Sequence, residues 1–99
     1  MSLKDNPKVA KSIRRLQNLG LVVDVIEQSP DWCIVVIERD SIIRAMRRIV
    51  ERNISYPNSL VLDNREAECL EVHFWRGKMP VMLRREVDRL WLEGSKNSQ

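Results

Sequence analysis

The chain has 99 residues, of which 43% are hydrophobic and 31% charged, so one domain with one hydrophobic core is expected. It has no run near the roughly 18 apolar residues of a membrane span, and its start, MSLKDNPKVAKS, lacks the apolar core of a signal peptide. These features argue against a membrane protein or a secreted one and predict an intracellular location. The two cysteines, Cys33 and Cys69, fit buried thiols in a reducing compartment, with a disulfide as the alternative.

The net charge of +3 is unevenly distributed along the chain. Residues 1–20 carry a net charge of +4 and residues 40–53 carry +2, whereas residues 21–39 carry −3 and residues 54–79 carry −1. The basic segments coincide with predicted helices, and the acidic segments coincide with predicted hairpins.

The first half of the chain predicts a helix, a hairpin and a second helix. Asn6 and Pro7 form a start signal, and Gly20 can end the first helix in the left-handed conformation. Val9, Ile13 and Leu16 recur at helical spacing as its buried stripe. Strands are expected at residues 21–27 and 32–38, around the turn QSPD, and a helix at residues 39–53. In that helix Asp40 is placed to cap the start, and the residues expected to face inward are Ile42, Met46, Ile49 and Val50.

The second half repeats this order. Strands are predicted at residues 60–63 and 69–75, and a last helix runs from Pro80 to Gly94. A single domain over residues 1–94 with a disordered tail at 95–99 is therefore expected. The fold class is α+β in the order α-ββ-α-ββ-α, with a four-stranded antiparallel sheet and the helices packed on one face.

The two ββα halves resemble each other, which raises the possibility of an internal duplication. LVVD at residues 21–24 matches LVLD at 60–63, Cys33 matches Cys69, and MRRIVER matches LRREVDR, at offsets of 39, 36 and 37 residues. Duplication would place the hairpins about a pseudo-twofold axis, and chance similarity is the alternative.

Alternation along the strands, read with the Cys33–Cys69 alignment, assigns the two faces of the sheet. The inward face is expected to hold Trp32, Ile34, Val36, Leu70, Val72 and Phe74. The outer face is expected to hold Cys69, Glu71, His73 and Trp75, with Cys33, Val35 and Ile37 beside Val22, Asp24 and Ile26. Because half of that face is apolar, we expect a homodimer interface there, formed by Val22, Ile26, Val35, Ile37, His73 and Trp75.

Catalytic and metal-binding chemistry are disfavoured by residue types and spacing. Cys69 and His73 are four positions apart on one strand, which separates their α-carbons by roughly 13 Å at about 3.3 Å per residue. One His and two distant Cys do not make a zinc motif, and the three glycines cannot form a phosphate-binding loop. We expect no enzyme, no cofactor and no metal, with Asp24 and Asp63 as solvated hairpin charges.

Arginines on the predicted helices are the leading candidate binding residues. Arg44, Arg48 and Arg52 follow one another at intervals of four residues, and Arg85 with Arg89 repeats the spacing. Planar guanidinium groups suit phosphate or carboxylate partners. The alternative is a solvated surface of ion pairs with Glu51, Glu86, Asp88 and Glu93.

The stretch LEVHFWR, Leu70 to Arg76, resembles the terminal strand of type I-D anti-CRISPR proteins of rod-shaped viruses that infect hot-spring archaea. The compact, Arg-rich chain is also similar in style to small proteins of rod-shaped and filamentous DNA viruses of such hosts. The resemblance implies a thermostable, often dimeric viral protein acting in the host cytoplasm. Those anti-CRISPR proteins are acidic and this chain is basic, so their inhibitory surface is not carried over to any residue.

The order of elements also resembles the core of LAGLIDADG endonucleases. The segment RRLQNLGLVVD lacks the glycines and the metal-binding acid of that signature, which sets the chain apart. The leading expectation is a binding protein that contacts nucleic acid or an acidic partner through its Arg-bearing helices. The second is an inhibitor of a host defence complex that acts through Glu71, His73 and Trp75 on the outer sheet face. A small nuclease or other enzyme is a third alternative.

Overall fold

The computed structural model describes residues 2–38 and 43–97. Within them the chain forms three α-helices and a four-stranded antiparallel sheet in the predicted order α-ββ-α-ββ-α. A short 3-10 helix precedes these elements at Leu3–Asp5, which the sequence did not predict. The elements are α1 (Pro7–Asn18), β1 (Val22–Ser29), β2 (Trp32–Glu38), α2 (Ile43–Arg52), β3 (Ser59–Asn64), β4 (Cys69–Trp75) and α3 (Val81–Asn97).

The two ends of α1 follow the predicted signals. The Asn6 side chain accepts a hydrogen bond from the backbone N–H of Lys8 at 3.0 Å, and Pro7 occupies the first helical position. Gly20 has a φ of 75°, the left-handed conformation that glycine adopts without strain. The predicted cap of α2, Asp40, and its neighbour Ile42 lie outside the described residues.

The strands lie in the order β1-β2-β4-β3, and the register fixes which residues share a face. Cys33 pairs with Phe74, Val35 with Val72, and Ile37 with Leu70. Directly paired residues lie on the same face, so odd-numbered residues of β2 share a face with even-numbered residues of β4. This register contradicts the predicted face assignment, which placed Leu70, Val72 and Phe74 beside Trp32, Ile34 and Val36.

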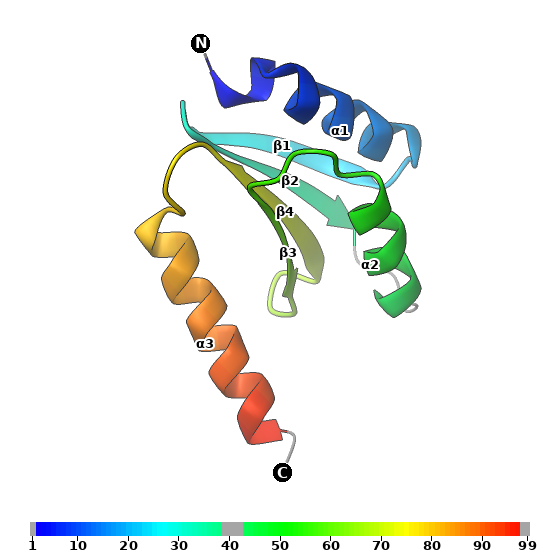
Figure 1. Ribbon diagram of the computed structural model, residues 1–99. Helices are drawn as coiled ribbons and strands as arrows, with labels where there is room; N and C mark the ends of the chain where they lie inside the picture. Colours follow the sequence, from blue (N-terminus) through cyan, green and yellow to red (C-terminus); the bar gives the residue numbers. More distant parts are fainter. Residues whose placement is uncertain (1, 39–42, 98–99) are drawn as a thin grey trace.

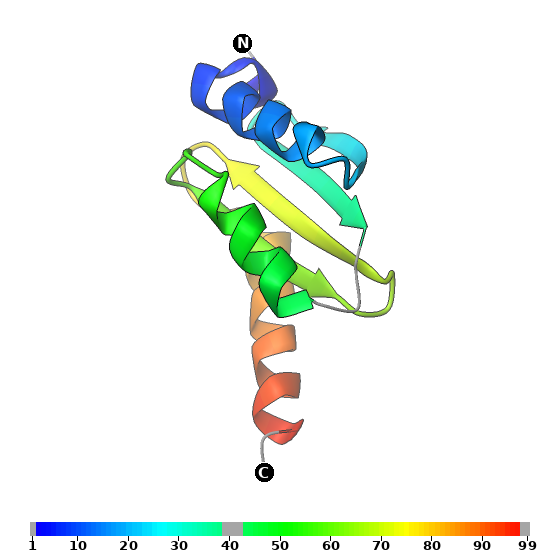
Figure 2. The ribbon, with the colours of Figure 1, turned by 90° about the vertical axis from the view of Figure 1, so that its right-hand side faces the viewer.

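The main core lies between one face of the sheet and helices α1 and α2, which lie side by side over it (Figure 2). Val9, Ile13 and Leu16 of α1 are buried there as predicted. From α2, Met46 and Val50 enter the core as predicted. The remaining core residues are Leu3, Cys33, Val35, Ile37, Val61, Leu70, Val72 and Phe74.

Helix α3 packs on the opposite face of the sheet, so the expectation that all helices cover one face is wrong (Figure 1). Its buried Leu83 contacts a second, smaller core with Leu62 and Trp75. The helix also continues through Gly94 to Asn97, so residues 95–97 belong to α3 and not to a separate tail. Residues 98 and 99 lie outside the described part.

The opposite placement of α2 and α3 bears on the expected pseudo-twofold arrangement. The strand order β1-β2-β4-β3 is symmetric about the β2–β4 pair. A twofold axis that relates antiparallel neighbours is perpendicular to the sheet, so it would keep both helices on the same face. The helices therefore break the symmetry that the strand order allows, and the duplication itself stays a prediction.

Within the described residues, every helix is too short or too polar to cross a membrane.

Candidate nucleic-acid interface

The inward stripe of α1 directs its charged residues to solvent. Because Val9, Ile13 and Leu16 face the sheet, the opposite side of the helix must be exposed. The sequence of α1 contains no acidic residue. Its exposed cations are Lys8, Lys11, Arg14 and Arg15.

Helix α2 is arranged in the same way on the same face of the sheet. Burial of Met46 and Val50 leaves Arg48 and Arg52 exposed, at the predicted spacing of four residues. Arg44 lies in the first turn of α2, and its side chain is outside the described part of the structure. Ile49 was expected to face inward, but it is 44% exposed because it lies beside the Met46–Val50 stripe and not within it.

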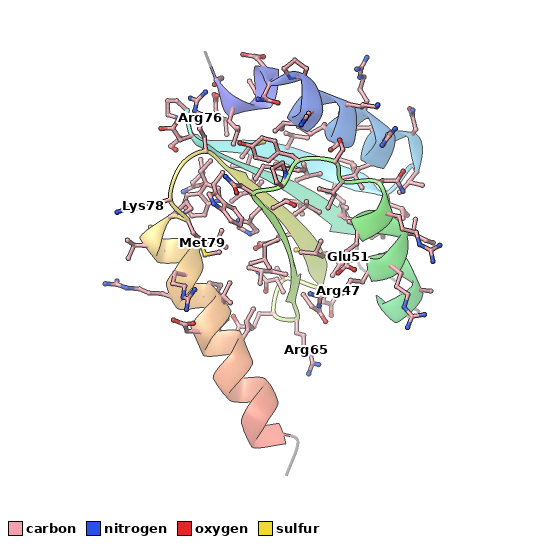
Figure 3. The ribbon with its side chains drawn as sticks, viewed as in Figure 1. Arg47, Glu51, Arg65, Arg76, Lys78 and Met79 are labelled. Carbon is pink, nitrogen blue, oxygen red and sulfur yellow. The ribbon has the colours of Figure 1, made fainter. Side chains whose placement is uncertain are left out.

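Arg47 has a structural contact that the sequence did not reveal. Its Nη2 donates a hydrogen bond to the backbone carbonyl of Val61 at 2.9 Å, and its Nε lies 3.1 Å from Oε1 of Glu51. Figure 3 shows Arg47 and Glu51 close together on α2, beside the sheet. Arg47 therefore ties α2 to β3, and Glu51 neutralises it.

A buried serine joins α1 to the chain that follows α2. Ser12 is fully buried, and its Oγ donates to the carbonyl of Lys8 at 2.9 Å. The same Oγ accepts a hydrogen bond from the backbone N–H of Ser55 at 3.0 Å. Since Ser55 comes three residues after the end of α2, this contact fixes the C-terminal end of α2 beside α1.

The two helices thus present basic residues on the same side of the sheet, and we call these residues together the α1–α2 basic surface. Helices α1 and α2 together hold eight of the 17 Lys and Arg residues and one of the 14 Asp and Glu residues. The rest of the chain therefore has nine cationic residues against thirteen acidic ones. The surface consists of Lys8, Lys11, Arg14, Arg15, Arg48 and Arg52.

These six side chains make no hydrogen bond or ion pair with another residue that the structure describes. Arginines elsewhere in the described structure are mostly paired, and Figure 3 shows two of them, Arg65 on the β3–β4 turn just below Arg47, and Arg76 at the other end of β4. The pairs, with their nitrogen–oxygen distances, are Arg65–Asp63 at 3.8 Å, Arg76–Asp31 at 2.5 Å, Arg84–Asp88 at 3.4 Å and Arg89–Glu86 at 2.5 Å. Most of the described cations without a partner therefore lie on one side of the sheet, and Lys78 and Arg85 are the described exceptions.

The structure separates the predicted arginines into two groups. Arg48 and Arg52 lie in the α1–α2 basic surface, whereas Arg85 and Arg89 lie on α3 across the sheet. Arg89 is also paired with Glu86, in line with the alternative of surface ion pairs. The prediction omitted the cations of α1, although a twelve-residue helix with four cations and no acid is visible in the sequence.

The predicted outer-face interface is largely buried. Val35 and Ile37 lie in the main core under the helices, and Val22 packs against that core as a half-buried residue. Ile26 is the fourth aliphatic residue of the predicted interface, and it alone of the four is exposed. The expected patch depended on aligning Cys33 with Cys69, and the observed register places these residues on opposite faces.

His73 and Trp75 are buried on the face that α3 covers. The indole N–H of Trp32 donates to Nδ1 of His73 at 3.0 Å, and Nε2 of His73 lies 3.1 Å from Oε1 of Glu71. The hydrogen bond with His73 lowers the pKa of Glu71, opposed by burial and assisted by a hydrogen bond from Asn64. Both ring nitrogens of His73 are therefore engaged within the protein.

Neither the cysteines nor the acidic residues that the structure describes form a recognisable reactive site. Among the residues that the structure describes, no group of three His, Cys, Asp or Glu side chains is arranged to hold a metal ion. Burial raises the pKa of both thiols, Cys33 and Cys69, and nearby carboxylates add to the effect. A thiol of raised pKa is a poor nucleophile at neutral pH.

Comparison with protein-family models, curated protein sequences and solved structures gives no match. The viral origin, the host-cell location and the resemblance to anti-CRISPR proteins stay predictions.

Proposed function

We propose that this chain is a binding protein that contacts the phosphate backbone of nucleic acid through the α1–α2 basic surface. The observation that supports it is the set of six exposed cations without partners in the described structure. Lys and Arg side chains that neutralise phosphates release counterions, and this release supplies most of the affinity in sequence-independent binding.

The residue types on the surface favour a duplex over a single strand. Proteins that bind single strands without sequence preference stack the bases on exposed aromatic side chains. Helices α1 and α2 contain no Phe, Tyr or Trp. Contacts from this surface would therefore go mainly to phosphates, which position a protein on DNA or RNA without reading sequence.

The alternative of an inhibitor that acts through Glu71, His73 and Trp75 is not favoured, because α3 covers that part of the sheet. Trp75 packs beneath Leu83 in the second core, and His73 is only 4% exposed. A partner could reach these side chains only if α3 moved away.

The test is a fluorescence-anisotropy titration of a labelled random-sequence duplex, with Arg15→Ala and Arg48→Ala as variants. Each variant should weaken binding to every sequence alike, since each removes a phosphate contact. Arg84→Ala is the matched control, because Arg84 is an exposed arginine of α3, on the opposite side of the sheet. Equal losses for Arg84→Ala and Arg48→Ala would contradict a defined site on α1 and α2.

A further inference from the structure

The α3 side chains that the structure describes cover only half of the outer face of the sheet. The helix reaches β3, β4 and one end of β2 through Leu83, Val87 and Leu90 (Figure 1). On the other half, three apolar side chains of β1 and β2 face outward, one exposed (Ile26) and two half-buried (Ile34 and Val36), and they belong to neither core of the described residues. We call this half the open sheet surface, formed by Ile26, Ile34 and Val36.

The helix α3 has its own uncovered apolar surface, on the side turned away from the sheet. Val81 and Met82 are each 67% exposed. Arg85 lies one turn further along, is also exposed, and has no ion-pair partner in the described structure. At helical spacing Val81 and Arg85 lie on the side opposite Leu83 and Val87, which pack on the sheet, and Met82 lies on the exposed flank beside them.

The open sheet surface is flanked by acidic residues, whereas the exposed side of α3 carries an arginine. The hairpin of β1 and β2, residues 22–38, contains four acidic residues and no Lys or Arg. Two of the acids, Asp24 and Glu38, lie on the same face as the open sheet surface. An apolar surface flanked by carboxylates thus fits an apolar helix side that carries an arginine.

A second copy of the chain can bring the exposed side of α3 onto the open sheet surface in a closed, twofold-symmetric dimer. If two copies face each other about a twofold axis parallel to the strands, the β1–β2 half of each lies opposite the β3–β4 half of the other. Each α3 then lies between its own β3–β4 pair and the open sheet surface of its partner. The same contact is formed twice, as a twofold interface requires. Both surfaces of both copies are then occupied, so no further copy can add to form a filament.

We propose that the chain forms a twofold homodimer in which α3 of each copy packs on Ile26, Ile34 and Val36 of the other. This interface lies on the side of the sheet away from α1 and α2, so it does not depend on the proposed nucleic-acid function. The α1–α2 basic surfaces of the two copies then point away from each other, and one dimer presents two of them.

The test is light scattering coupled to gel filtration at tens of micromolar protein, on the wild type and two charge-introducing variants. The wild type should have twice the monomer mass of 11.7 kDa. Met82→Asp and Ile26→Asp should each shift the protein to the monomer mass, because each buries a carboxylate in the interface. Met82 is exposed in the single chain, so its substitution should leave the fold intact, as checked by circular dichroism.

The matched control is Ile49→Asp, the same kind of change at an exposed apolar residue of α2, across the sheet. It should leave the mass at twice 11.7 kDa. A monomeric wild type, or a Met82→Asp variant that remains dimeric, would overturn the proposal. A mass that keeps rising with concentration would also overturn it, since it would show an open, head-to-tail contact.

Discussion

Trp32 fixes the tautomer of the neutral His73 ring. The indole nitrogen is a donor only, so its 3.0 Å hydrogen bond to Nδ1 requires that this nitrogen carry no proton. The proton of the neutral ring is then on Nε2 and is donated to Glu71, whose second oxygen accepts from Asn64 at 3.3 Å. Four polar side chains from β2, β3 and β4 thus satisfy one another beside α3.

Trp32→Phe should destabilise the protein, because it leaves Nδ1 of a buried histidine without a donor. An unsatisfied buried polar group costs about 1–3 kcal/mol of unfolding free energy. Urea unfolding of Trp32→Phe, His73→Ala and the double variant forms a cycle that isolates the pair, with an expected coupling of about 0.5–3 kcal/mol. Additive losses in the double variant would show that the hydrogen bond contributes nothing.

The lowered pKa of Glu71 predicts a specific acid sensitivity. A carboxyl group whose pKa is lower in the folded state stabilises the fold above its ordinary pKa of 4.5 and loses this effect as pH falls through the folded value. The free energy of unfolding should therefore decrease as pH drops below about 4.5, and Glu71→Gln should reduce this decrease. The control is Glu66→Gln, at an exposed carboxyl of the β3–β4 turn. It should hardly change the decrease in unfolding free energy at low pH.

The same substitution, isoleucine to alanine, should affect the unfolding free energy differently on the two faces of the β1–β2 hairpin. Ile37 is 1% exposed in the main core, whereas Ile26 is 38% exposed on the open sheet surface. Ile37→Ala should lower the unfolding free energy by about 2–5 kcal/mol, as for other core truncations. Under conditions in which the protein is monomeric, Ile26→Ala should stay within about 0.5 kcal/mol of the wild type. The reverse order would mean that the strand register is wrong.

Local signals in the sequence predicted most of the elements. The Asn6–Pro7 start, the glycine at residue 20 and the β-branched strands all act within a few residues, so their effects can be read without knowing the fold. The end of α3 was missed because Gly94 was read as a stop signal, although the helix continues past it.

The faces of the sheet could not be predicted, because they depend on register between distant strands. Aligning Cys33 with Cys69 uses an even offset of 36 residues, whereas the register pairs odd-numbered with even-numbered residues across β2 and β4. A shift of one residue moves every side chain to the other face. For that reason Val35 and Ile37 were predicted outside and are found in the core.

The candidate site was predicted in part. The spacing of Arg48 and Arg52 follows from helix geometry alone, and the structure leaves both exposed. Which helices share a face of the sheet is a tertiary property. The sequence therefore could not show that α1 joins α2 while Arg85 and Arg89 lie across the sheet.

The thiols should be slow to react in the folded protein. Cys33 and Cys69 are buried with raised pKa values, and they lie on opposite faces of the sheet as free cysteines. Thiol titration with Ellman's reagent at neutral pH should therefore be slow in buffer and complete in denaturant. Rapid labelling of either cysteine in buffer would contradict its burial.

The central claim is that phosphates bind the α1–α2 basic surface, and the salt dependence of affinity tests it most directly. Each phosphate contact contributes about −0.9 to the slope of log affinity against log salt on duplex DNA. Between three and six contacts on one duplex should therefore give a slope between about −3 and −5. Anisotropy titrations from low to physiological salt measure this slope. Binding that is absent at low salt, or an affinity that salt does not change, would contradict the account.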